Sequence, residues 1–66
     1  MTVTEASKLK RGDRVAMTRD PDPWTVSQVY VWSRREVEVL IARGTSELRL
    51  HSSLALRSLK HWKEPR

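Results

Sequence analysis

Residues 36–51 read EVEVLIARGTSELRLH, and this stretch decides the fold class. Apolar and polar side chains alternate on both sides of Gly44. The alternating apolar members are Val37, Val39, Ile41, Leu48 and Leu50. A period of two places such side chains on one face of a β-strand, and a glycine between two runs is typical of a tight turn. The stretch therefore predicts a hairpin of two antiparallel strands, residues 36–42 and 45–51.

The register of this hairpin can be deduced from its side chains. If Arg43-Gly44 forms the loop, Ala42 lies opposite Thr45. Apolar pairs then share one face and an ion pair lies on the other, which is the arrangement that cross-strand energetics favour. The expected inner pairs are Val39 with Leu48 and Val37 with Leu50. The expected outer pairs are Glu38 with Arg49, Glu36 with His51, and Leu40 with Glu47.

The strand before this hairpin covers residues 24–32 and is apolar on both faces. Val26 and Val29 cannot share a face of a regular strand, because side chains alternate residue by residue. We expect a bulge near Ser27-Gln28 that turns Val26, Val29 and Val31 inward together. Strongly bent strands of this kind suit small closed barrels. Across the connection Ser33-Arg34-Arg35, the expected pairs are Trp32 with Glu36, Val31 with Val37, and Tyr30 with Glu38.

The first strand is expected over residues 13–19. Residues 5–11 are compatible with a helical turn, but Lys10-Arg11-Gly12-Asp13 is interpreted more simply as a turn that starts this strand. After it, the prolines of Arg19-Asp20-Pro21-Asp22-Pro23 predict a stiff loop. Prolines cannot donate ladder hydrogen bonds, and each pushes the residue before it into extended geometry.

The C-terminal part predicts one helical turn at Ser52-Ser53-Leu54 and a short last strand over residues 55–59. We divide the chain into one domain, residues 1–60, and a basic C-terminal tail, residues 61–66. The fold class expected is all-β, a single small barrel of about five antiparallel strands. Its expected core consists of Leu9, Val15, Met17, Val26, Val29, Val31, Val37, Val39, Ile41, Leu48, Leu50, Leu54, Leu56 and Leu59.

Composition narrows the function classes. The chain has 66 residues and no cysteine, which predicts one domain without disulfides or thiolate metal sites. The net charge is +5, and residues 34–66 hold +4 of it, with eight basic and four acidic side chains. This excess favours nucleic acid, an anionic membrane surface or an acidic protein, but an arginine-rich composition also arises from a GC-rich genome. We expect a cytoplasmic protein, because neither a secretory signal nor ~20 consecutive apolar residues is present.

The segment Leu9-Lys10-Arg11-Gly12-Asp13-Arg14-Val15 resembles the opening of KOW-type and Tudor-like barrels. In both, an apolar residue and a Gly-Asp turn precede an apolar strand. The order of strands and the helical turn before the last one also look like an SH3-like barrel, over residues 9–59. The resemblance implies a small barrel and contacts to RNA or the ribosome. KOW motifs place glycines after the first strand, where this chain has residues 20–24. The arginine-rich, compact style is similar to small proteins of actinobacteria or their phages.

The function expected first is a non-enzymatic binding module that attaches to DNA or RNA through a basic patch with an aromatic contact. Arginines at hairpin tips can clamp phosphates, although they are equally often solubilising turn residues. Trp62 either stacks on a base or folds back as a cap over the open end of the barrel. The candidate nucleic-acid-binding residues are Arg34, Arg35, Arg43, Arg57, Lys60, Lys63 and Trp62.

The alternative function is protein–protein interaction, as a phage or bacterial accessory regulator or as a homo-oligomer. Glu36 and Glu38 would lie beside the exposed rings and repel phosphates, which favours a protein partner. The surface is also consistent with an ordinary solvated sheet face. The candidate partner-binding residues are Trp24, Tyr30 and Trp32, together with the Asp-Pro segment.

Few residues in the sequence support a catalytic function. His51 and His61 are the only histidines, and no third group is placed to orient an imidazole beside a nucleophile. Asp20 and Asp22 flank Pro21, but a Ca²⁺ site takes six or more oxygen ligands. We therefore expect no enzyme, no cofactor, no metal and no small-molecule substrate.

Overall fold

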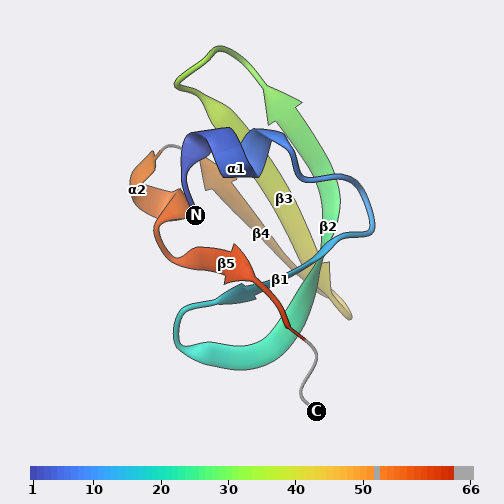
Figure 1. Ribbon diagram of the computed structural model, residues 1–66. Helices are drawn as coiled ribbons and strands as arrows, with labels where there is room; N and C mark the ends of the chain where they lie inside the picture. The colour runs from blue at the N-terminus through green and yellow to red at the C-terminus, as the bar shows by residue number, and fades with distance from the viewer. Residues whose placement is uncertain (52, 64–66) are drawn as a thin grey trace.

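A computed structural model describes residues 1–51 and 53–63 and consists mostly of β-structure (Figure 1). The strands form one antiparallel sheet in the order β4-β3-β2-β1-β5. No helix in the described residues is long and apolar enough to cross a membrane. The elements are α1 (Val3–Ser7), β1 (Arg14–Met17), β2 (Asp20–Val31), β3 (Val37–Arg43), β4 (Ser46–His51), α2 (Ser53–Leu56) and β5 (Leu59–His61).

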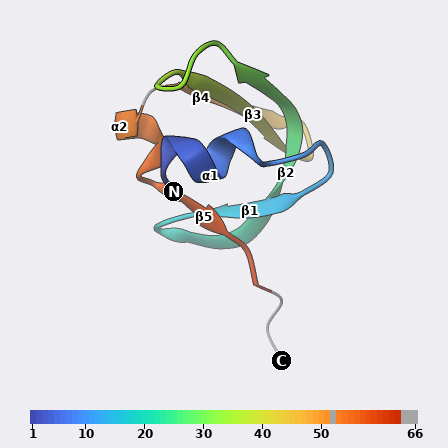
Figure 2. The ribbon, with the colours of Figure 1, turned by 45° about the horizontal axis from the view of Figure 1, so that its top comes forward.

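The sheet is strongly curved but does not close into a barrel. β2 bends so that β3 and β4 lie above β1 and β5, with α1 across the concave side (Figure 2). Within the described part of the chain, β4 pairs only with β3, and β5 only with β1. The prediction of an all-β chain with five antiparallel strands is confirmed, whereas the prediction of a closed barrel is wrong. The two edge strands do not meet, and helical residues fill the space between the halves.

The hairpin of β3 and β4 has the predicted faces but a different register. Ile41, not Val39, lies opposite Leu48, and Val39 lies opposite Leu50. The turn is Gly44-Thr45 rather than Arg43-Gly44, because Gly44 adopts φ 62° at the first central position, as hairpin turns of the primed types require. A shift of two residues preserves which side chains face inward. Its main consequence is that Leu48 is 41% exposed, so the prediction that Leu48 belongs to the core is wrong.

The hairpin of β2 and β3 confirms the predicted register. Val31 lies opposite Val37, Tyr30 lies opposite Glu38, and the register shifts between Val26 and Gln28, where the bulge was expected. The bulge turns Val26 into the core and leaves Val29 partly buried against it. The prediction for Val31 is wrong, since its side chain is 57% exposed. Val31 ends β2, where it borders a hollow of about 380 Å³ beside α1 instead of packed side chains.

The segment predicted as a stiff loop is the beginning of β2. β1 and β2 form a tight hairpin with its turn at Thr18-Arg19, and Met17 lies opposite Asp20. Prolines are tolerated here because, among the described residues, this part of β2 pairs only with β1, and the register of that pair is irregular between Val15 and Met17. Prolines in sheets are confined to such edges and bulges.

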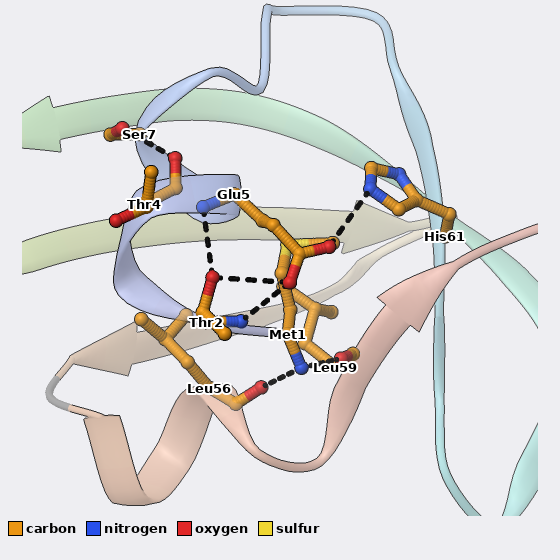
Figure 3. A network of polar contacts seen from close by, with 8 residues as sticks. All are labelled: Met1, Thr2, Thr4, Glu5, Ser7, Leu56, Leu59 and His61. Carbon is orange, nitrogen blue, oxygen red and sulfur yellow. Dashed lines mark hydrogen bonds and ion pairs between the residues drawn. The ribbon is translucent and has the colours of Figure 1, made fainter.

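Helix α1 is the element that the sequence reading missed. Thr2 caps it: the Thr2 hydroxyl accepts a hydrogen bond from the Glu5 backbone N–H, and the Glu5 carboxylate accepts one from the Thr2 N–H (Figure 3). The pattern Thr2-x-x-Glu5 is a capping box and was a usable signal. The helix buries Ala6 completely, and the Met1 amino group donates hydrogen bonds to the carbonyls of Leu56 and Leu59. The predicted turn at residues 10–13 follows it and is confirmed.

The helical turn before the last strand is confirmed as α2, but the strand starts later than predicted. β5 covers Leu59–His61 rather than residues 55–59, and it pairs with β1. The predicted role of Leu54 in the core lies outside the described side chains, as does Ser52 altogether. The other predicted core residues are buried or partly buried, apart from Val31 and Leu48. Buried residues that the sequence reading did not place in the core are Ala6, Ala16 and Trp24.

Candidate functional site

Arg43 and Trp24 have structural positions that the sequence reading did not foresee. Arg43 ends β3 instead of occupying a hairpin tip, and its guanidinium lies 4.3 Å from the centroid of the Trp24 ring. Its Nη1 also lies 2.7 Å from Oδ2 of Asp20. Trp24 is only 5% exposed, so its ring packs in the core and does not line an open groove. Arg43 and Asp20 thereby cover the end of the core. Nothing in the sequence indicates that these two residues form a pair.

The ion pair changes the acidity of Asp20. A hydrogen bond from Arg43, followed by one from the Asp22 backbone N–H, holds the pKa of Asp20 below its ordinary value. Both donors favour the carboxylate over the carboxylic acid.

We expect Asp20→Asn to be less stable than the wild type at neutral pH. Because the folded-state pKa of Asp20 is lowered, its stabilisation is complete above the ordinary aspartate pKa of about 3.9 and is lost as the pH falls through the lowered value. Urea unfolding of both proteins at neutral and acid pH measures this difference, which should shrink towards zero in acid. Equal stability at neutral pH would contradict the assignment.

Tyr30 and Trp32 form an exposed aromatic pair on the outer face of the sheet. Their ring centroids lie 5.8 Å apart, and the ring planes differ by 24°. Tyr30 is 40% exposed and Trp32 is 63% exposed. These two residues, named here the Tyr30–Trp32 platform, match their predicted position on the outer face. Because the two rings are already in contact, a further flat group can stack on them with little loss of side-chain conformational entropy.

The acidic residues beside the platform are partly neutralised. Glu38 lies opposite Tyr30, and its Oε1 is 2.9 Å from Nε of Arg49. Glu36 lies further out, with its Oε2 3.9 Å from Nε2 of His51. Both contacts were predicted as directly opposite pairs, and the structure makes them as diagonal contacts across the shifted register. The charge of Glu38 is thus offset locally, while that of Glu36 remains at the surface.

Arg34 and Arg35 lie in the connection between β2 and β3, directly after the platform, and both are exposed. The connection is held by hydrogen bonds from the backbone N–H groups of Trp32 and Ser33 to the Glu36 carbonyl. The Ser33 hydroxyl also accepts one from the Arg35 N–H. The two arginines therefore lie on a hydrogen-bonded turn that directly follows Trp32, and Arg34 also lines the hollow beside α1.

Lys60 and Lys63, two of the other candidate cations, line a groove on β1, β2 and β5. Its volume is about 650 Å³, and its floor includes the buried side chain of Ala16. Trp62 is half-buried in its wall, outside the core, and the Arg14 guanidinium lies 5.4 Å from the ring centroid. Trp62 thus does not cap the core, and Arg14 is a neighbour that the sequence did not indicate. The lining residues are Ala16, Asp20, Asp22, Pro23, Lys60, His61, Trp62 and Lys63.

The predicted basic residues do not converge on one patch. β1 pairs with the first half of β2, and β5 pairs with β1, whereas Arg34 and Arg35 follow the far end of β2. The connection between β2 and β3 therefore lies at the opposite end of the molecule from β1 and β5 (Figure 1). Arg57 is exposed between α2 and β5, and Arg43 is engaged by Asp20. The long strand β2 therefore separates basic residues that the sequence predicted to lie in one patch.

The two histidines are also apart. His51 lies near Glu36, and Nε2 of His61 lies 3.9 Å from Oε2 of Glu5 (Figure 3).

Compared with known proteins, the chain matches no protein-family model, no curated protein and no solved structure. Inference about function therefore depends on the geometry of its surfaces.

Proposed function

We propose that this chain is a non-enzymatic, SH3-like binding module that attaches to single-stranded nucleic acid. Five antiparallel strands, tight hairpins and the helix α2 before the last strand support the resemblance to SH3-like folds. The sheet is open rather than closed, so the likeness concerns the order of elements.

The observation that carries the proposal is the Tyr30–Trp32 platform beside Arg34 and Arg35. Bases of a single strand are free to stack on aromatic side chains, and any base offers a flat face for this. Guanidinium groups on the turn that directly follows Trp32 can bind the phosphates that connect the stacked bases. The net charge of +5 would assist the approach of a polyanion. Lys60, Lys63 and Trp62 form a second basic surface that a longer strand could reach.

A protein partner on the same platform is the second candidate function. The exposed carboxylate of Glu36 lies beside the rings and disfavours phosphate, whereas tryptophan, tyrosine and arginine are the residues that dominate the energy of protein interfaces. This candidate is separated from the first by salt dependence and by the nature of the ligand bound.

We expect Trp32→Ala to weaken binding of a fluorescein-labelled single-stranded oligonucleotide by roughly fivefold or more, since a base–aromatic stack contributes about 1–3 kcal/mol. Trp32 is largely exposed, so the domain should stay folded. Fluorescence anisotropy with DNA and RNA oligonucleotides measures the affinity. Trp32→Phe is the matched control and should retain most of the binding, because it keeps a flat ring.

The double variant Arg34→Ala, Arg35→Ala tests the electrostatic part. Each neutralised phosphate contributes about −0.7 to the slope of log K against log salt for single strands, so the slope should become shallower by about 1.4. An unchanged anisotropy with every oligonucleotide at low salt would reject the proposal. Binding that is equally strong for Trp32→Ala would exclude the platform as the site.

A further inference from the structure

β4 is an edge strand of the sheet, and helix α2 contacts it after its last residue. It pairs with β3 alone, so one side of the strand has backbone N–H and C=O groups without a ladder partner among the described residues. Such an edge is a template for another strand, and proteins usually block it with a proline, a bulge or a covering element. β4 contains no proline, and its register with β3 is uninterrupted from Glu38 to Arg43. Ser46 to Arg49 are all exposed.

An apolar side chain lies at the middle of this edge. Leu48 is opposite the fully buried Ile41 and therefore points to the inner side of the sheet, yet it remains 41% exposed. Glu47 and Arg49 flank it and point to the outer face. The edge thus presents an apolar residue between one negative and one positive charge.

The turn before β4 indicates which backbone groups are available. A β-turn over residues 43–46 directs the N–H of Ser46 towards β3, as the hydrogen bond of such turns requires. Because antiparallel strands alternate the direction of these groups, those of Glu47 and Arg49 point to the free side. Leu48 then occupies the position of a non-hydrogen-bonded pair, in which opposing side chains lie closest.

We propose that β4 pairs antiparallel with β4 of a second copy of this chain, around a twofold axis at Leu48. The two copies of Leu48 face each other on the inner side. On the outer side, Glu47 of each copy lies opposite Arg49 of the other, and the backbone groups of these two residues complete the ladder. A twofold interface of this kind uses the same surface of both subunits, as closed dimers do.

The neighbouring registers are disfavoured by charge. An axis at Glu47 would set two glutamates against each other, and an axis at Arg49 would set two arginines against each other. Like charges directly opposite each other destabilise strand pairing, whereas opposite charges stabilise it. The residues around Leu48 therefore select one register of self-pairing. A short edge contact buries little area, so the dimer should form reversibly with rising concentration.

Charge reversal tests the pairing. Sedimentation equilibrium from micromolar to millimolar concentration should show a monomer–dimer equilibrium for the wild type. Glu47→Arg should weaken it by roughly tenfold or more, because it sets two like-charged pairs across the axis. Arg49→Glu should do the same, and because it also removes the ion pair with Glu38, its circular dichroism spectrum is compared with that of the wild type. An equimolar mixture of these two variants should dimerise again, since every pair across the axis is then of opposite charge. Arg11→Glu, a reversal in the turn before β1, is the matched control and should dimerise like the wild type.

Leu48→Lys gives an independent test, because it places a charge on the inner side of the edge while Ile41 stays buried. It should be monomeric at every concentration, with an unchanged far-ultraviolet circular dichroism spectrum. A wild-type chain that stays monomeric up to millimolar concentration would overturn the proposal. So would a dimer that persists in Leu48→Lys, or a mixture of the two charge variants that does not associate.

Discussion

Ile41→Ala is expected to leave the chain largely unfolded under conditions in which the wild type is folded. Ile41 is fully buried at the centre of β3, between the pairs that it makes with Val26 on β2 and Leu48 on β4. Truncation of such a side chain costs about 2–5 kcal/mol. A domain of this size has a net stability of roughly 3–5 kcal/mol, so the loss consumes most of it.

The matched control is Leu48→Ala, which removes a side chain of the same size directly opposite Ile41. Because Leu48 is 41% exposed, this change should cost about 1 kcal/mol or less. Urea unfolding followed by circular dichroism, at concentrations low enough to keep the chain monomeric, measures both variants. The register would be wrong if Leu48→Ala cost as much as Ile41→Ala. In the register expected from sequence, Leu48 would lie opposite Val39 in the core.

Trp24→Ala should have a comparable effect, with a loss of about 3–5 kcal/mol. Trp24 closes the end of the core below Arg43, and removal of its ring leaves a cavity in the core. The Arg43 guanidinium would also lose the ring face over which it lies. Unfolding in urea, followed through the remaining tryptophans, would detect the loss as a lower midpoint.

Trp24→Phe separates ring packing from polar contacts. The Trp24 Nε1–H is buried and has no hydrogen-bond partner among the described residues. Loss of an unpaired buried donor carries no penalty, so this variant should lose far less stability than Trp24→Ala. Similar losses in the two variants would mean that the indole N–H, and not the packed ring, stabilises this end of the domain.

Much of the fold followed from local pattern. The alternation through Val37 and Val39 identified a strand and its inner face, and the awkward spacing of Val26 and Val29 identified the bulge in β2. These predictions succeeded because the face of a strand and the position of a bulge both depend on the spacing of apolar residues along the chain. The capping box at Thr2 and Glu5 is an equally local signal for helix α1, although it was not among the predictions above.

Other features depend on which segments meet. The two residues Asp20 and Arg43 form an ion pair across the sheet, and nothing near either of them along the chain indicates the other. The prolines of β2 predicted a loop because a strand interior excludes them, yet they lie where β2 pairs, in the part of the chain that the structure describes, with β1 alone. The same limit applies to the candidate site, since Arg34 follows the far end of β2, whereas Lys60 lies on β5 beside β1, which pairs with the near end of β2.

The sequence alone thus determined the class of fold, the inner and outer faces of the central strands, and the exposure of Tyr30 and Trp32 on the outer one. It did so because a side chain's face is set by its parity along a strand. Only the tertiary structure decided the register at Gly44-Thr45, the open edge at β4, and the separation of the cations into two surfaces. A shift of two residues leaves every face unchanged, so hydrophobic alternation does not distinguish these registers, and packing across the curved sheet selects between them.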